Sequence, residues 1–239
     1  LIPCTVFNDP LRGNPHKLVL CETQRPNGEY LENSHRHWAK EQFDSAKEEE
    51  PWFGLEQEYF MINPTTKLPF GFDEKGKQGQ YYCSVGAINA FGRSVADEHL
   101  MCCLRAGLSI SGINAEVAPG QWEFQNFAKG AKRAGDEMWV ARYLLERLAE
   151  EYGLAIEYHP KPLGNTDWNG SGMHANFSNE VMRTSGDEKI FNKICEEFGK
   201  NISKHIDVYG ADNDQRLTGL HETCLLYTSP SPRDLSTSR

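Results

Sequence analysis

The chain has 239 residues, 38% of them hydrophobic and 11% aromatic, so it is long enough for one substantial core or for a core with part of a second domain. Its formal net charge of -9 argues against a general nucleic-acid binder, because neutralising phosphates requires a surplus of Lys and Arg. An anionic substrate would therefore need local cations or a bound metal.

The sequence favours a cytoplasmic protein. No apolar run reaches the roughly 18 residues that span a bilayer, and the opening LIPCTVFNDP lacks the pattern of a signal peptide. The seven cysteines include no C-x-x-C motif, which indicates free thiols in a reducing compartment. The chain begins at Leu1 and not at Met, so we expect a fragment whose true N-terminus is missing, and an organellar form stays open.

The predicted elements give an α+β class. Two short strands are expected near Cys4–Phe7 and Lys17–Leu20, followed by a helix from Asn33 to Lys47 and an acidic surface loop before Pro51. Alternating or apolar runs predict further strands at residues 52–61, 81–87, 108–117, 121–126, 154–159 and 172–178. The protein is therefore expected to contain a sheet, flanked by helices, that faces a site.

Three helices follow along the chain. Capping boxes at Ser94 and Ser185 predict two helix starts, and Gly107 predicts the end of the first helix. The helix between them is expected over Asp136–Tyr152. Its predicted core face consists of Met138, Ala141, Leu145 and Leu148. The last helix has a four-residue spacing that predicts a core-facing seam of Ile190, Ile194, Phe198 and Ile202.

The stretch WFGLEQEYF places two carboxylates in a strand that is otherwise mostly apolar. Residues i and i+2 of a strand point to the same face, so Glu56 and Glu58 project together. Their repulsion requires a shared proton, basic side chains or a divalent cation, unless this face of the strand is simply exposed.

A second segment repeats this arrangement. In NAEVAPGQWEFQ, a two-residue loop at Pro119-Gly120 would pair Glu116 with Glu123 across a hairpin, where like charges destabilise each other. Pro-Gly favours a turn type that is unusual in hairpins, so this register is a hypothesis.

The third segment is NGSGMHANFS. Its glycines allow close approach of the backbone, and His174, Asn176 and Ser178 alternate onto one face of a strand. Four carboxylates with one imidazole favour Mg²⁺ or Mn²⁺ over zinc, and five ligands fit two or more metals with a phosphorylated substrate. The chain has neither a P-loop nor a G-x-G-x-x-G motif. These residues indicate a metal-nucleotide enzyme built on a sheet.

Five motifs in order resemble glutamine synthetase of the eukaryotic type: WFGLEQEY, YYCSVGA, NAEVAPGQWEFQ, DWNGSGMHANFS and RLTGLHET. The resemblance implies a glutamine synthetase/guanido kinase-like catalytic domain, with a curved antiparallel sheet flanked by helices. It also implies ATP-dependent ligation of ammonia to L-glutamate through γ-glutamyl phosphate, giving L-glutamine, ADP and phosphate. Two or three Mg²⁺ or Mn²⁺ ions per site are expected, in a homo-oligomer of two stacked pentameric rings.

The resemblance also implies roles for individual residues. Glu56 and His174 would serve the metal nearest the γ-phosphate of ATP, and Glu58, Glu116 and Glu123 the metal beside glutamate. Single charge reversals at Glu56 and Glu58 should therefore give different defects. Substrate contacts are expected from Trp168, Asn169, Gly170 and Arg216, and nucleotide contacts from Trp52, Glu123, Phe124, Gln125, Asn176, Phe177 and Ser178. Glu222 matches the flap glutamate that excludes water and assists proton removal from ammonium. Arg216, which would grip a substrate carboxylate, is also expected to be catalytic.

The chain departs from the family in two places. Asn126-Phe127-Ala128 replaces a common Gly-Pro near the nucleotide, which puts backbone contacts there in doubt. Residues 224–239 are similar to a translated sequencing adapter, and we expect them to be non-native. The expected domains are a β-grasp remnant at 1–32, a truncated catalytic domain at 33–223 and this tail, in a fragment that is itself inactive.

Two other functions fit parts of the pattern. A metal-dependent phosphatase or related hydrolase would use clustered carboxylates with one His, but it would not need Arg216 and Glu222 in a mobile segment. A non-catalytic relative would keep the fold without cations, although buried repulsive carboxylates are expensive to maintain without them.

Overall fold

A computed structural model describes residues 1–211 and 213–219. It contains seven strands, which are β1 (Ile2–Asn8), β2 (Lys17–Glu22), β3 (Trp52–Ile62), β4 (Ile110–Ala115), β5 (Gln121–Lys129), β6 (Ala155–Glu157) and β7 (Met173–Ser178). The helices are α1 (His35–Ser45), α2 (Arg93–Ala106), α3 (Ala131–Glu151), α4 (Glu180–Ser185), α5 (Glu188–Lys200), α6 (Ile202–Val208) and α7 (Asn213–Arg216), with a 3-10 turn at Lys47–Glu49. The predicted α+β class is confirmed.

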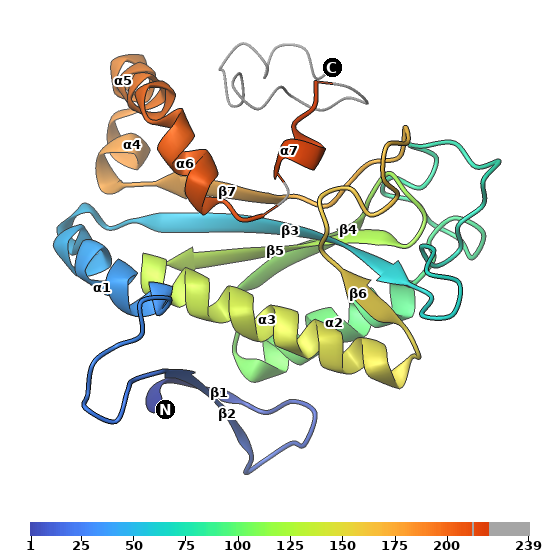
Figure 1. Cartoon of the computed structure of the whole chain (residues 1–239), viewed down its shortest axis with the longest axis horizontal. Coiled ribbons are helices and arrows are strands. Elements are labelled where there is room, and N and C mark those ends of the chain that lie inside the picture. Colours follow the sequence, from blue (N-terminus) through green and yellow to red (C-terminus); the bar gives the residue numbers. More distant parts are fainter. Residues whose placement is uncertain (212, 220–239) are drawn as a thin grey trace.

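The main sheet is antiparallel and has the order β4-β5-β3-β6, with β7 also pairing with β3. Figure 1 shows α2 and α3 together on one side of this sheet, while the opposite side faces α7. One edge of β3 is shared: β7 pairs with its first half, Trp52–Gln57, and β6 with its end, Phe60–Ile62. This division of the edge becomes important at the site.

The two faces of β3 have opposite chemistry, as the period of two predicts. Leu55, Tyr59 and Met61 belong to the core cluster that packs against α2 and α3. Glu56 and Glu58 lie on the other face. Burial of the apolar face stabilises the sheet by roughly 1.5–3 kcal/mol per large side chain, and it fixes which face carries the carboxylates.

Helix α3 covers the core face of the sheet with the predicted stripe. Met138, Ala141, Leu145 and Leu148 are all buried, which confirms the predicted face. The helix begins at Ala131, five residues before the predicted start at Asp136. Gly130, with φ of 94°, ends β5 and turns directly into the helix, so no separate loop intervenes.

Both predicted capping boxes are wrong, although both helices exist. Helix α2 begins at Arg93 after Gly92, a residue in the left-handed conformation, and Ser94 already lies in its first turn. Asp187 caps α5 by accepting a 2.9 Å hydrogen bond from the Lys189 N–H, while Ser185 ends α4. The predicted end of α2 at Gly107 is confirmed.

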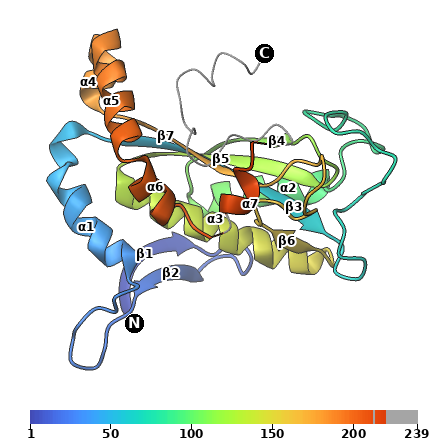
Figure 2. The ribbon, with the colours of Figure 1, turned by 45° about the horizontal axis from the view of Figure 1, so that its top comes forward.

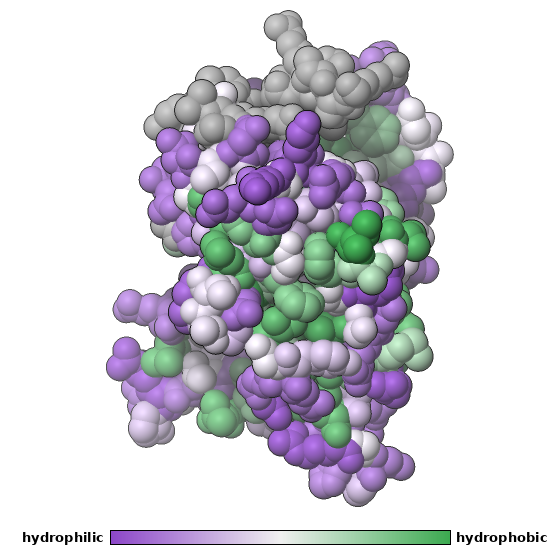
Figure 3. Space-filling view, turned by 90° about the vertical axis from the view of Figure 1, so that its right-hand side faces the viewer, coloured by the Kyte–Doolittle hydropathy of each residue, from purple (hydrophilic) through white to green (hydrophobic). Residues whose placement is uncertain are grey.

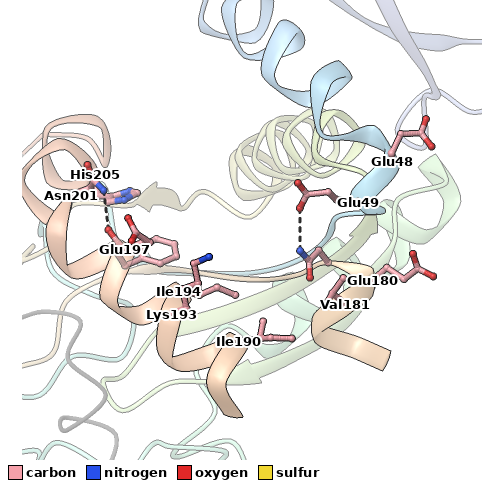
Figure 4. Close-up of a pocket in the computed structure, with 12 residues that line it drawn as sticks. Glu48, Glu49, Glu180, Val181, Ile190, Lys193, Ile194, Glu197, Asn201 and His205 are labelled. Carbon is pink, nitrogen blue, oxygen red and sulfur yellow. Dashed lines mark hydrogen bonds between the residues drawn. The ribbon is translucent and has the colours of Figure 1, made fainter. Parts of the chain in front are cut away.

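The predicted core seam of α5 does not reach the core. No residue of α5 is buried in the described structure, and the helix ends at Lys200, before Ile202. Ile190, Ile194 and Phe198 instead line an open groove of about 680 Å³ against α4 and the 3-10 turn (Figure 4). The spacing correctly predicted a shared face, but the periodicity does not determine what covers that face.

The segment between β3 and α2 contains no helix or strand in the described structure, so the strand predicted at residues 81–87 is wrong. Cys83 has φ of 49° and Gly86 has φ of 98°, and these values interrupt an extended run. The segment follows the end of β4 and the turn after it, through hydrogen bonds from the Cys83 N–H to the Ala115 carbonyl and from the Gly79 N–H to the Val117 carbonyl. Its exposed apolar side chains contribute to the mixed surface on the side seen in Figure 3.

The N-terminal hairpin of β1 and β2 is attached to the main body through α1 and α3 (Figure 2). The Arg36 guanidinium forms ion pairs with Glu22 and, at 2.7 Å, with Asp136. Asp136 also accepts a 2.5 Å hydrogen bond from Thr5. This network joins β1, β2, α1 and α3 through one arginine. Among the described residues, no helix has both the length and the apolarity that crossing a bilayer requires.

His99 makes the core sensitive to acid. It is completely buried on α2, and its Nε2 lies 2.9 Å from the Ala141 carbonyl. Burial lowers the His99 pKa from 6.5 to about 4, so the unfolded chain binds a proton between these values and the folded chain does not. Stability should therefore fall as the pH drops from 6.5 to 4, by about 3 kcal/mol from this group.

Denaturant unfolding of the wild type and of His99→Gln across that range checks this expectation. The stability difference between the two proteins should change in favour of the variant as the pH falls, because glutamine does not titrate. A difference that is independent of pH would show that His99 does not carry the effect.

Candidate metal centre

Strand pairing brings the predicted ligands together from three strands. Glu58 on β3 lies directly opposite Glu123 on β5, and Glu56 lies opposite His174 on β7. Two groups result, Glu56–Glu123–His174 and Glu58–Glu116–Glu123, and within each group the ligand atoms lie within 4.8 Å of one another. Glu123 belongs to both groups and is therefore the centre of the arrangement.

The hairpin register differs from the prediction by two residues. Asn114, and not Glu116, lies opposite Glu123, because residues 116–120 form a longer connection. A Cβ on Gly120, whose φ is 69°, would lie 2.7 Å from the Phe70 carbonyl oxygen, which explains glycine at this turn. A shift of two residues leaves every side chain on its original face, so Glu116 still reaches the site.

Hydrogen bonds hold each carboxylate in place. The Gly172 N–H donates to Glu58 at 2.5 Å, and the Asn114 amide donates to Glu116 at 2.7 Å. Glu56 accepts a 2.5 Å hydrogen bond from Asn176 and lies 3.6 Å from the His174 Nδ1. Each carboxylate therefore keeps lone pairs for a further ligand.

The electrostatics of the site disfavour several negative charges at once. Burial and the neighbouring Glu123 raise the Glu116 pKa to about 7. Burial also raises the Glu123 pKa, an effect that the Gln125 amide opposes and the Glu56 carboxylate supports. A bound divalent cation would reverse this balance by stabilising the ionised forms.

The donor set fits hard cations. The two groups offer carboxylate oxygens with a single imidazole and no thiolate, which suits Mg²⁺ or Mn²⁺ better than zinc. His174 is largely exposed, with 59% of its side chain accessible, so a ligand can approach from the open side. The residues present therefore fit a pair of divalent metals.

The predicted substrate residues lie on a loop that folds tightly beside the metal groups. The Lys161 ammonium donates to the Thr166 carbonyl at 3.1 Å and also to the Trp168 carbonyl. Gln121, next to the carboxylates on β5, donates to the Gly170 carbonyl at 3.2 Å. The Asn169 N–H donates to the Gln78 side chain. Trp168, Asn169 and Gly170 are thus held at one end of the metal centre.

The predicted nucleotide residues lie toward the other end of β3. Trp52 has the guanidinium of Arg183 3.9 Å from its ring centroid and the ammonium of Lys129 at 4.4 Å. Ser178 pairs with Trp52 across β7, and its hydroxyl accepts a 3.0 Å hydrogen bond from Arg183. Phe177 points away from this surface and packs against Phe198 of α5.

Phe124 and Gln125 have different positions on β5. Phe124 is completely buried against Tyr59 and His99, so its side chain is unavailable to a ligand. Gln125 lies on the site face, where its amide donates to Asn114 at 2.5 Å and to Glu123. Gln125 therefore orients the shared carboxylate.

Asn126, Phe127 and Ala128, which replace the Gly-Pro of the family, belong to the end of β5. Without a proline, the strand continues through Asn126, Phe127 and Ala128 and pairs with β3 up to Lys129. Phe127 stands on the site face with its ring 5.7 Å from that of Trp52. Asn126 is buried and donates to Glu137 at 2.7 Å. The chain presents an aromatic pair at this position.

The two predicted catalytic residues, Arg216 and Glu222, lie in the C-terminal part of the chain. The backbone of Arg216 belongs to α7, which Figure 1 shows on the site side of the sheet. Glu222 and the tail at residues 224–239 lie outside the described residues.

Several residues that contact the site were missed by the sequence interpretation: Gln57, Arg142, Lys161 and Gly172. Gln57 carried a visible signal, because it is a polar residue on the apolar face of β3. The Lys161 ammonium binds backbone carbonyls, and Gly172 acts through its own backbone, and hydrogen bonds to backbone groups leave no residue pattern.

Comparison with known proteins gives a consistent family. Residues 32–205 match the catalytic domain of glutamine synthetase. A putative glutamine synthetase from Acanthamoeba polyphaga mimivirus is 49% identical over 93% of this chain and 63% of its own length. Glutamine synthetases from Agaricus bisporus and Bradyrhizobium diazoefficiens are 48% and 51% identical, over 93% of this chain and 63% and 64% of their own lengths. The chain thus spans less than two thirds of these relatives, and it belongs to the glutamine synthetase family.

Proposed function

We propose that the protein ligates ammonia to L-glutamate at the expense of ATP, through γ-glutamyl phosphate. The observation that carries this proposal is the pair of carboxylate groups that share Glu123 on one face of the sheet. Two adjacent metals can bind both the phosphate that is transferred and the group that receives it. The substrates are L-glutamate, ammonium and ATP, as the family and its relatives suggest.

Each group has its own part in the proposal. Glu56, His174 and Glu123 would hold the metal beside the ATP phosphates, and Glu58, Glu116 and Glu123 the metal beside glutamate. When bound, Mg²⁺ or Mn²⁺ offsets the negative charge that develops on the transferring phosphoryl group. Gln125 and Asn114 hold their carboxylates by hydrogen bonds, so little reorganisation is needed when substrate binds.

The geometry of β3 supports one orientation of the bound nucleotide, with its base near Trp52 and its terminal phosphate near Glu56. Trp52 lies four residues before Glu56 on the same strand face, which corresponds to about 13 Å. The base would lie at Trp52 and Phe127 with Ser178 nearby, and the terminal phosphate would lie at Glu56. Glutamate would occupy the opposite end, beside Asn169 and Gly170.

The remaining steps are assigned to residues of the C-terminal part of the chain. Arg216 would bind a substrate carboxylate, and Glu222 would cover the intermediate and take a proton from ammonium. Ammonium becomes a nucleophile only after losing a proton, and an acyl phosphate hydrolyses if water enters. We also propose that the subunits assemble into two pentameric rings, and that residues 1–32 belong to a β-grasp domain.

The proposal is tested by measuring glutamine formation by the complete gene product. We expect glutamine only when glutamate, ammonium, ATP and Mg²⁺ or Mn²⁺ are all present. Phosphate release from simple phosphoesters without glutamine formation would indicate a phosphatase instead. A protein that binds no Mn²⁺ would correspond to a non-catalytic relative, and both results would overturn the proposal.

A further inference from the structure

The shared edge of β3 leaves a gap in the hydrogen-bond ladder beside a metal carboxylate. Strand β7 pairs with β3 only as far as Gln57, and β6 begins to pair at Phe60. Glu58 lies between these two partners. The residue that lies beside Glu58 on this edge is Gly172, which immediately precedes β7.

Side-chain hydrogen bonds of Gln57 fill the gap. Its carboxamide nitrogen donates to the Glu58 carbonyl at 2.7 Å and to the Gly172 carbonyl at 3.2 Å. The Glu58 N–H donates to the same Gly172 carbonyl at 3.0 Å, and the Gly172 N–H donates to the Glu58 carboxylate at 2.5 Å. The metal carboxylate and the start of β7 are therefore held together by one local network.

Arg142 fixes the orientation of the Gln57 carboxamide. Its Nε donates to the Gln57 Oε1 at 2.9 Å, and its Nη2 donates to the same oxygen. A guanidinium offers only donors, so the oxygen of the carboxamide must face Arg142 and the NH₂ group must face the two carbonyls. Arg142 is itself held over the rings of Trp139 and Tyr158.

We infer that Gln57 and Arg142 are positioning residues that hold the Glu58 carboxylate for its metal from the core side of the sheet. Neither side chain belongs to the metal groups, since both lie on the α3 side of β3. Groups that orient metal ligands typically alter metal affinity by 10- to 100-fold when they are removed. The inference rests on the proposed function, because it assumes that Glu58 binds a metal.

The two residues also influence the substrate loop. Gly172 is two residues from Gly170, whose carbonyl is held by Gln121. Displacement of Gly172 would therefore move Asn169 and Gly170 together with the Glu58 carboxylate. A purely structural role predicts a general loss of stability, whereas positioning predicts a selective effect on the Glu58 side of the site.

The first test variant is Gln57→Glu. It keeps the shape and turns the hydrogen bonds from Arg142 into an ion pair, but it replaces the donor that faces the carbonyls of Glu58 and Gly172 with an acceptor. We expect the affinity for one Mn²⁺ ion to fall about 10-fold or more, while the second ion binds as in the wild type. Mn²⁺ titration followed by calorimetry or electron paramagnetic resonance measures both affinities.

The second variant is Arg142→Leu, which leaves an apolar stem against Trp139 and Tyr158 but frees the carboxamide to rotate. It should weaken the same Mn²⁺ ion as Gln57→Glu, and neither change should add to the effect of Glu58→Gln. Glu146→Gln is the matched control, because Glu146 lies one turn further on α3 at an exposed position and has no hydrogen bond to Gln57. It should bind both ions normally.

Hydrogen exchange of the Glu58 and Gly172 amides provides a readout that does not depend on metal. Both variants should speed this exchange while the buried core of α3 keeps its protection. Normal Mn²⁺ affinities with unchanged exchange, or a parallel loss of both ions and of global stability, would overturn the inference. If the wild type binds no Mn²⁺, the proposed function fails, and the exchange result alone decides whether the two residues position Glu58.

Discussion

Glu123→Gln should abolish binding of both metals, because both carboxylate groups share this side chain. The affinity for each Mn²⁺ ion is expected to fall by at least about 100-fold, and ligase activity should fall with it. The metal-free variant should nevertheless be more stable than the metal-free wild type. Its neutral side chain removes repulsion from Glu56, while its amide oxygen can still accept the hydrogen bond from Gln125.

Two single changes serve as controls for this result. Glu56→Gln affects only the group with His174, and Glu58→Gln only the group with Glu116. Each should therefore remove one ion, with the defect in nucleotide use for Glu56→Gln and in glutamate use for Glu58→Gln. Loss of only one ion in Glu123→Gln, or identical defects in the two controls, would contradict the shared arrangement. Mn²⁺ titration with substrate saturation curves distinguishes these outcomes.

Gly170→Ala should disrupt the substrate loop. A Cβ at this position would overlap the carbonyl oxygen of Pro160, and the backbone on both sides is held by hydrogen bonds from Lys161 and Gln121. The loop must open to accept a methyl group, and we expect a loss of about 3 kcal/mol in stability. Displacement of Asn169 should raise the KM for glutamate about 10-fold or more and leave the KM for ATP nearly unchanged.

Gly135→Ala provides a matched control on α3. Its Cβ would meet no atom within 4 Å, so the same substitution should stabilise the helix by about 0.5–1 kcal/mol. Thermal unfolding should show a loss of stability for Gly170→Ala and a gain for Gly135→Ala. Glutamate saturation curves measure the expected rise in KM for Gly170→Ala. Equal stabilities for the two variants would show that the loop accommodates a side chain at Gly170.

The face predicted for Glu56 and Glu58 from strand periodicity agrees with the structure. The common face of Glu56 and Glu58 followed from a local rule, and burial of the opposite face enforces it. The hairpin register required the length of the turn, and Pro119-Gly120 indicated a shorter turn than the five residues observed. A shift of two residues keeps each side chain on its face, so Glu116 still lies beside Glu58 and Glu123 despite the error.

Other parts of the structure depend on contacts that no local pattern records. The seam of α5 predicted which side chains share a face, but the partner of that face is a property of tertiary packing. Arg142 is 85 residues from Gln57 in the sequence, and their contact exists only once α3 lies on the sheet. Lys161 binds carbonyl groups, so the residues that it contacts are free to have any side chain.

Pairing along the shared edge of β3 sets the position of His174 independently of the length of the loop between β6 and β7. The chain leaves this edge after Glu157 and returns to it at Met173, and the position of His174 opposite Glu56 is set by pairing within β7. Residues inserted into or removed from the outer part of the intervening connection do not change that pairing. The outer part of the connection can therefore diverge in length and sequence while His174 stays opposite Glu56, whereas the last residues of the connection are tied to the Glu58 carboxylate through Gly172.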